Sequence, residues 1–430
     1  MVQLASQFEL RRQAALTRID ALGDLRRVVG LPRAIDLDER DWRGLQKPLD
    51  ALQRKLRLSM GGLGTLQAAA GRLDARQRNM SYRLGRIELE ISKAFTLYDT
   101  YMDILTQRHS PSLGPLLRGC DILALDALDC KGLPTLSRRA PVVYCDRGFG
   151  ASILRSSIRL FEGILNSTPL IQIPYARLKE LLHLTSICHE VGHEVLSNSG
   201  IAEALAEAIA EALEKERVPA DIIDLYRFWS SEIGPDFWGF LCSGSAQSKT
   251  ITEILALPPD HAFRITPREP HPPAYLRALL SFAWCRRAWG EGPWDAWEKD
   301  WRALYPLSDA PQRVRGSIEE ACAAIPVVTQ VLFTTRFRAA AGKALPELLD
   351  TGALRPKALA AAAEALVDRS RPAEGARPCV VLAQFRSAHD RQLADRLTID
   401  RLMAAWLHGL VARRPNRKHE RVELERMVVR

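Results

Sequence analysis

The chain has 430 residues, 47% of them apolar, and its 60 Lys and Arg against 51 Asp and Glu give a net charge of +9. This composition is enough to bury one large core or several ordinary ones, which excludes a disordered protein. The charge is modest for the length and is spread along the chain, so it does not by itself indicate nucleic-acid binding.

The amino-terminal residues, MVQLASQFELRRQ, lack the uninterrupted apolar stretch of a secretory signal. The longest apolar stretches, around Ala278–Trp284 and Ala321–Thr335, are shorter than the roughly 18 residues that a membrane span needs. The eight cysteines form no CxxC pair, a pattern typical of reduced thiols. We therefore expect a cytoplasmic protein without a membrane-spanning segment.

Two apolar stripes at helical spacing occupy the first 112 residues. One contains Leu45, Leu49, Leu52 and Leu56 and ends at a glycine-rich turn, and the second runs from residue 66 to residue 105. They predict an antiparallel helical hairpin over residues 1–112. This region either packs as an ordinary helical domain or binds a helical partner or a second copy of the chain.

The pattern changes after residue 112 to a mixture of short apolar runs and helical periodicity. The runs Pro141–Cys145 and Pro169–Pro174 predict strands. The periodic segments Ala176–Leu196, Ile201–Lys215 and Asp221–Phe240 predict helices. We expect a mostly α (α+β) core with a small sheet over residues 113–306.

Residues 307–430 are rich in Ala, Leu and Arg, with prolines as punctuation, and predict short packed helices. The tail from Arg413 onward is basic but interleaved with glutamates, which favours a solvated terminal segment over a nucleic-acid contact.

The segment His189-Glu190-Val191-Gly192-His193 carries the clearest chemical signal. Residues four apart share a helix face, so the two imidazoles can bind one ion while Glu190 lies beside them. With a third protein ligand, Zn²⁺ keeps a position for water and lowers the water pKa towards about 7. Glu190 is then the expected general base.

A third ligand is expected from the helix that follows. Glu232 lies on a separate predicted helix, and Asp236, four residues later, can accept the second ring N–H of a ligating histidine. Pro235 lies between them, lacks a backbone N–H and can kink the helix before Asp236. The intervening glutamates recur at helical spacing as a solvated face, with Glu211 as the alternative ligand.

Together, His189, Glu190, His193, Glu232 and Asp236 resemble the gluzincin type of zinc metallopeptidase, in which HExxH is completed by a Glu on a following helix. The resemblance covers roughly residues 140–280 and implies a zincin-like core with one zinc per chain. It also implies that the predicted strand Pro169–Pro174 is an edge strand that pairs with extended substrate.

The segment from Glu269 to Arg277 offers further candidates. His271 or Tyr275 could stabilise an oxyanion, and Arg277 could bind a carboxylate. Alternatively, His271 caps the helix that begins near Pro273, and Arg277 forms a local ion pair. The spacing of His271-Pro272 and Arg277 resembles that in some bacterial HExxH proteins.

Other conspicuous side chains have ordinary explanations. The tryptophans between residues 284 and 301 are expected to fill the core rather than a specificity pocket. His183 and Cys188 are expected to point away from the ligating face.

The leading hypothesis is a zinc metallopeptidase that hydrolyses peptide bonds of a protein or peptide substrate with zinc-activated water, Glu190 being the general base. We expect regulated or narrowly specific cleavage, since a cytoplasmic peptidase needs restraint. Two alternatives stay open: a non-catalytic zinc-containing binding or regulatory protein, and a zinc hydrolase of a non-peptide substrate.

Overall fold

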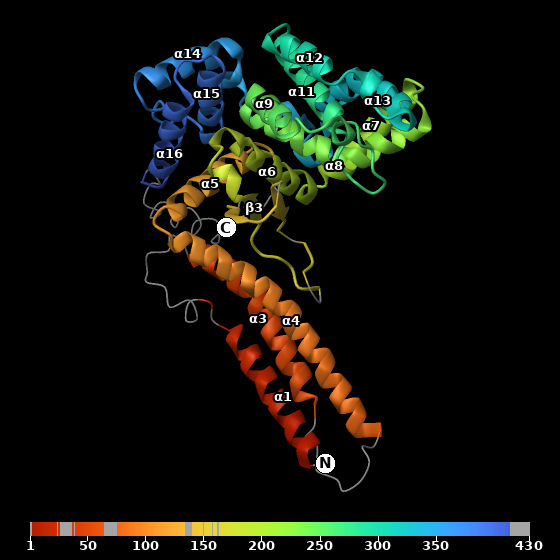
Figure 1. The fold of residues 1–430 in the computed structure, drawn as a ribbon, viewed down its shortest axis with the longest axis vertical. Helices are drawn as coiled ribbons and strands as arrows, with labels where there is room; N and C mark the ends of the chain where they lie inside the picture. The colour runs from red at the N-terminus through yellow and green to blue at the C-terminus, as the bar shows by residue number, and fades with distance from the viewer. Residues whose placement is uncertain are drawn as a thin grey trace. The chain divides into compact units, whose positions relative to one another are not determined.

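The computed structural model of the protein describes residues 2–23, 25, 37, 39–63, 75–133, 140–148, 150–156, 158–160 and 163–412 (Figure 1). The chain is mostly helical with a small sheet, as the sequence predicts. Two predicted features, the beginning of the second apolar stripe at residues 66–74 and the basic tail from Arg413, lie outside the described residues.

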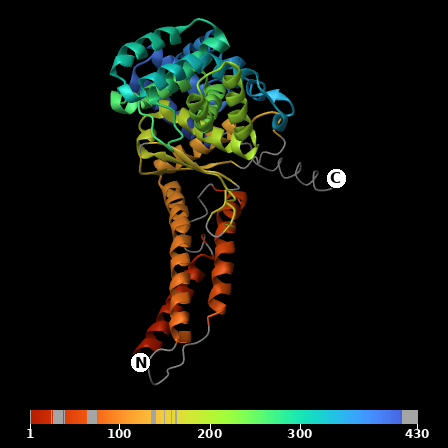
Figure 2. The same ribbon diagram turned by 90° about the vertical axis from the view of Figure 1, so that its right-hand side faces the viewer.

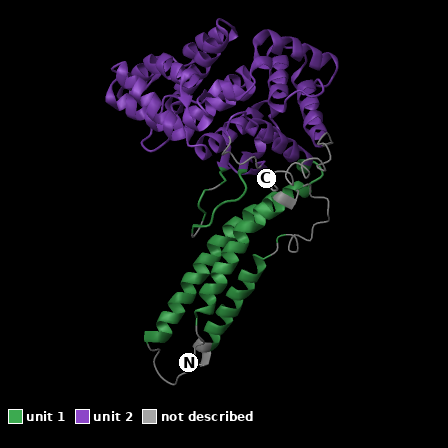
Figure 3. Ribbon diagram, turned by 180° about the vertical axis from the view of Figure 1, so that it is seen from behind, with its two compact units in different colours: residues 1–114, 154–170 green, residues 115–153, 171–430 purple. Residues whose placement is uncertain are grey.

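The chain divides into two compact units (Figure 3). Unit 1 comprises residues 1–114 and 154–170, and unit 2 comprises residues 115–153 and 171–430. The first limit lies close to the boundary predicted at residue 112. The boundary predicted at residue 306 does not separate compact units, because the helices that follow it pack on those that precede it.

Unit 1 contains three long helices, α1 (Val2–Ala21), α3 (Glu39–Gly61) and α4 (Ala75–His109). The predicted hairpin corresponds to α3 and α4, and its first apolar stripe is buried, as expected for a packed face. The hairpin prediction missed α1, which packs against both of the other helices, so the three run alongside one another as a bundle (Figure 2).

The small sheet consists of β1 (Val142–Asp146), β2 (Ser152–Leu154) and β3 (Leu170–Pro174). The two apolar runs predicted as strands are confirmed as β1 and β3, whereas the three residues of β2 are too few to show a pattern. The order is β1-β3-β2. Because β3 is paired on both sides, the expectation that it is an edge strand is wrong, and its backbone has no free edge for a substrate strand.

The predicted helix over Ala176–Leu196 is divided in the structure. Two 3-10 turns, Tyr175–Leu178 and Leu181–Leu184, precede helix α6, which runs from Thr185 to Asn198. The helices that follow, α7 (Ile201–Lys215) and α8 (Ala220–Ser243), agree with the predicted ranges to within three residues.

Close contact between α6 and α8 depends on two glycines. A Cβ on Gly192 of α6 would lie 2.8 Å from Pro235 Cα, and a Cβ on Gly234 of α8 would lie 2.8 Å from Leu196 Cδ1. Without these methyl groups the two backbones can approach each other closely. Pro235 does not end α8, which stays helical up to Ser243.

The other helices cover this pair within unit 2 and include the short packed helices predicted for the carboxyl-terminal part. They are α5 (Leu113–Leu128), α9 (Ser245–Ile254), α10 (Pro259–Ala262), α11 (Ala274–Trp289), α12 (Pro293–Leu304), α13 (Gln312–Thr334), α14 (Pro356–Asp368), α15 (Pro378–Asp390) and α16 (Arg396–Ala412). Trp284, Trp294 and Trp301 are buried, which agrees with their predicted core role, whereas Trp289 and Trp297 are only partly buried.

Helix α13 is long and apolar enough, by length and composition alone, to cross a membrane, and it is the one such helix among the described residues. It packs against α7, α8 and α11. Core helices of soluble proteins meet the same criteria, so the absence of a membrane span stays a prediction.

Candidate metal centre

Helices α6 and α8 bring the predicted ligands together in unit 2. His189 and His193 lie one turn apart on α6, and their Nε2 atoms are 3.1 Å apart. Glu232 of α8 faces them, with its Oε2 3.3 Å from His189 Nε2 and 3.5 Å from His193 Nε2. These three side chains form a group that could hold a metal ion.

The Glu232 carboxylate has an unusual environment for a buried group. The residue is 7% exposed, and Oε2 has no hydrogen-bond partner among the described residues despite the nearby imidazole nitrogens. A buried carboxylate oxygen without a hydrogen bond is costly. A cation among the three converging atoms would compensate for this cost.

The orientation of His189 is set by a network behind it. Asp236 Oδ1 lies 2.8 Å from His189 Nδ1 and therefore accepts the ring N–H. In the neutral ring, this contact assigns the proton to Nδ1, so that the Nε2 lone pair would face the other ligands. Arg277 in turn donates from Nε and Nη2 to the two oxygens of Asp236, each at 2.8 Å.

The surrounding charges also favour a cation. Burial would raise the pKa of both carboxyls, but the imidazoles beside Glu232, and Arg277 with His189 beside Asp236, hold these pKa values well below the usual range. Burial lowers the pKa of His193. For His189 burial acts in the same direction, but the Asp236 carboxylate outweighs it and raises the pKa to about 10. Both carboxylates are therefore ionised at neutral pH, as ligation of a cation by Glu232 and acceptance of the His189 ring N–H by Asp236 require.

Glu190 is buried beside the ligands and differs from the other carboxylates. Burial raises its pKa to about 7, partly offset by the nearby His189, and the charges of Glu232, His271 and Arg277 also act on it. A carboxyl group with a pKa near neutrality can both accept and release a proton.

His271 reaches the same site from the segment that precedes α11. Its side chain is 48% exposed, and its Nε2 lies 3.3 Å from Glu232 Oε2. Its Nδ1 forms a short contact with Glu269 Oε1. Both ring nitrogens thus face carboxylate oxygens. Pro273 is the N-cap residue of α11, so His271 does not cap that helix.

Tyr275 and Arg277, the two other candidates from this segment, are engaged by other side chains of the protein. Tyr275 is buried, and its hydroxyl accepts a hydrogen bond from Arg302. Arg277 pairs with the carboxylate of Asp236 and not with a free site for a substrate carboxylate. This agrees with the alternative in which Arg277 forms an ion pair. We therefore do not assign either residue a substrate contact.

The residues expected to lie elsewhere do so. Glu211 is exposed on α7, where the neighbouring Glu207 and Glu214 pair with Arg227, as expected for a solvated face. His183 contacts Glu180 and Glu253.

The sequence analysis did not predict which carboxylates pair with His271 and Arg277. It also missed a cluster of three cysteines. The pairing of Glu269 with His271 had a signal, since the two are separated by a single residue. Arg277 is 41 positions from Asp236, and no spacing rule joins them. A second group that could hold a metal ion, Cys188, Cys242 and Cys379, spans 191 positions and has no signature in the sequence.

Comparison with protein-family models, with curated proteins and with solved structures found no match for this chain. The functional assignment therefore depends on the geometry and chemistry of the site.

Proposed function

We propose that this protein is a zinc-dependent metallopeptidase with one catalytic zinc, held by His189, His193 and Glu232. The observation that carries the proposal is the convergence of their three ligand atoms, 3.1–3.5 Å apart, beside the buried carboxyl of Glu190.

The ligand atoms suit zinc. Zinc binds imidazole nitrogen and carboxylate oxygen at about 2.0–2.2 Å with tetrahedral angles, which requires ligand atoms about 3.3–3.5 Å apart. Among the described residues the group has three members, and three protein ligands are typical of catalytic rather than structural zinc sites. This count supports an enzyme over a non-catalytic zinc protein.

A zinc ion at this position would polarise a substrate carbonyl and increase the acidity of a water molecule. Glu190 accepts the proton of the attacking water on its carboxylate. It then delivers this proton to the nitrogen of the leaving amine, so that the acyl carbon gains a hydroxyl oxygen and the C–N bond breaks.

The other residues support this chemistry by position. His271 donates from Nε2 to the oxyanion that develops on the carbonyl oxygen, and Glu269 orients its ring. Asp236 holds His189 in the tautomer whose Nε2 is free, and Arg277 fixes Asp236. The half-exposed His271 marks the side from which a substrate enters.

The proposed fold is a zincin-like core of the gluzincin type, in which α6 carries HExxH and α8 carries the third ligand with Asp236 one turn later. Since β3 lies in the centre of the sheet, the extended substrate has to bind elsewhere than along β3. We also propose regulated or narrowly specific cleavage in the cytoplasm. Free digestion of casein and of unrelated unfolded proteins by the full-length chain would contradict this specificity.

The test is cleavage of a diverse library of internally quenched peptides by the zinc-loaded protein, compared with Glu190→Gln. Loss of the general base should lower turnover by about 10²–10⁴-fold while zinc stays bound. The matched control is Glu194→Gln, the next carboxylate on α6 and also buried. Equal cleavage by wild type and Glu190→Gln would contradict the mechanism. No cleavage by the zinc-loaded wild type, with hydrolysis of non-peptide esters or amides instead, would favour the non-peptide hydrolase.

A further inference from the structure

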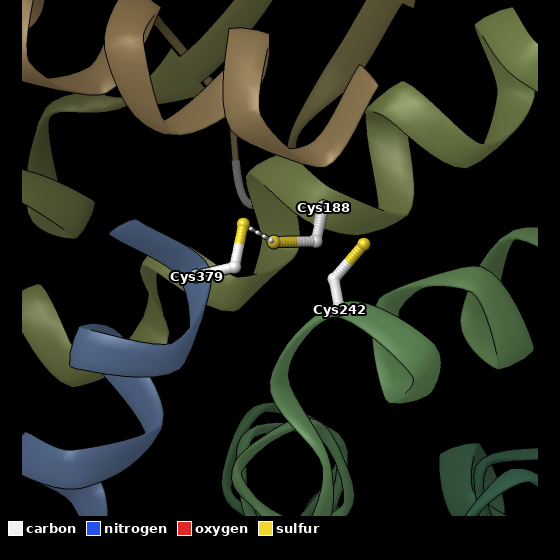
Figure 4. A group of neighbouring side chains, drawn as sticks. All are labelled: Cys188, Cys242 and Cys379. Carbon is white, nitrogen blue, oxygen red and sulfur yellow. Dashed lines mark hydrogen bonds between the residues drawn. The ribbon is translucent and has the colours of Figure 1, made fainter. Parts of the chain in front are cut away.

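Three cysteines converge behind the face of α6 that carries the histidines. Cys188 of α6, Cys242 of α8 and Cys379 of α15 are buried, and their Sγ atoms all lie within 4.8 Å of one another. Figure 4 shows the three side chains approaching from separate helices, with Cys188 and Cys379 directed towards each other. The Sγ atoms of this pair are 3.7 Å apart.

We propose that Cys188, Cys242 and Cys379 bind a second metal ion, a thiophilic closed-shell cation such as zinc(II) or copper(I). Metal–sulfur bonds of about 2.3 Å place thiolate sulfurs about 3.8–4.0 Å apart in a tetrahedral or trigonal site. The pair already stands near that separation. Three thiolates from three helices are the soft ligand set that selects zinc or copper(I) over harder cations.

Backbone carbonyls and an ion pair surround the cluster. The carboxyl-terminal end of α5 faces the cluster: Cys379 donates to the Leu123 carbonyl and Cys242 to the Ala127 carbonyl. The carboxylate of Asp126 accepts the backbone N–H of Cys379 and is paired with Arg377. The pKa of each thiol is raised, mainly by burial for Cys242 and Cys379 and by the contact with Cys242 for Cys188, so the metal-free thiols are protonated. An ion entering the cluster displaces the thiol protons, one from each sulfur that it binds.

Burial determines when the ion binds. All three residues are at most 1% exposed, so the ion is taken up as the chain folds and is released slowly. The bound ion would join α6, α8 and α15, whose cysteines lie far apart in the sequence. It would thereby fix the back of the helix that carries His189 and His193. This site is independent of the proposed peptidase activity.

The test separates the two sites with His193→Ala, which removes a ligand of the histidine site only. Protein is produced with zinc in the medium, and separately with copper, and metal per chain is measured by elemental analysis. The His193→Ala protein should retain about one equivalent. Adding Cys242→Ala should remove it, whereas adding Cys285→Ala, a buried cysteine outside the cluster, should not.

X-ray absorption of the His193→Ala protein identifies the ligands even if the Cys242→Ala variant fails to fold. Sulfur neighbours at about 2.3 Å would support the cluster as the second site. Nitrogen and oxygen neighbours alone, or folded His193→Ala protein without metal from either medium, would overturn it. Either result leaves the peptidase proposal to its own test, because that test uses Glu190.

Discussion

The two sides of helix α6 differ in the interactions that hold their side chains in place. On one side, His189 is held by a chain of hydrogen bonds through Asp236 to Arg277, and the site is open towards His271. On the other side, Cys188 lies in a closed core with two other thiols. A polar network can be disturbed one hydrogen bond at a time with measurable effects on binding. A substitution in a closed core mainly changes the free energy of unfolding.

After the loss of the general base Glu190, the largest effect on turnover is expected at His271, on the histidine side of α6. His271→Asn removes the proposed oxyanion donor and should lower turnover by about 10²–10³-fold, without loss of bound zinc. His261→Asn, an exposed histidine on α10, is the control and should retain full activity. Activity of His271→Asn equal to that of the control would leave this end of the site without a catalytic role.

Because Glu190 is buried, we expect the free energy of unfolding of the metal-free protein to depend on pH. Its pKa is raised by burial from 4.5 to about 7, so between these values the folded state holds a proton that the unfolded state has lost. The free energy of unfolding therefore falls as pH rises through this window, by roughly 3 kcal/mol for this group. Below pH 4 both states are protonated, and the contribution disappears.

Urea unfolding of the metal-free protein measures this cost by comparison with Glu190→Gln, whose amide does not titrate. The variant should be more stable than wild type at pH 8 and about equally stable at pH 4. Equal stability at pH 8 would mean that the carboxyl of Glu190 is not held in a low-dielectric environment.

The hydrogen-bond chain behind His189 can be tested separately from stability. Asp236→Asn should weaken zinc binding by about 10–100-fold, because His189 loses its orienting carboxylate. It also leaves the partly buried Arg277 unpaired, which lowers stability. The double variant Asp236→Asn/Arg277→Met removes this charge and should recover stability without recovering zinc affinity. Wild-type zinc affinity in the double variant would contradict an orienting role.

Gly192→Ala should disturb both sides of α6 at once. The added methyl group would lie 2.8 Å from Pro235 Cα and 2.9 Å from Trp238 Cβ, so α6 has to move away from α8. We expect a loss of about 1–3 kcal/mol in the free energy of unfolding, with weaker zinc binding. Gly316→Ala on α13, where the added methyl group would meet no neighbouring atom within 4 Å, is the control and should raise the free energy of unfolding by about 0.5–1 kcal/mol.

The smallest effect is expected at the exposed alternative ligand. Glu211→Gln should change neither zinc content nor turnover, because Glu211 lies on the solvated face of α7. Loss of zinc in this variant would show that the ligand set is assigned incorrectly.

Residues close in sequence account for what could be predicted. His189 and His193 share a helix face by their spacing alone, and Asp236 follows Glu232 by one helical turn on α8. The run of β1 is apolar and buried over Val142–Cys145, and that of β3 is interrupted only by Gln172, which makes both strands visible in the sequence.

The features that could not be predicted depend on contacts between distant segments. The central position of β3 is set by its pairing with β2, which is too short to leave a pattern. The paired hydrogen bonds from Arg277 to Asp236 and the contact between Cys379 and Cys188 follow from helix packing. No local periodicity encodes such contacts.

The most direct test of the central claim is the metal content of purified wild type, His193→Ala and Glu232→Ala, measured per chain without added metal. We predict that each variant contains one zinc fewer than wild type while remaining folded. Equal zinc content in all three proteins, or no zinc in wild type even after reconstitution, would contradict the claim that His189, His193 and Glu232 bind a metal ion.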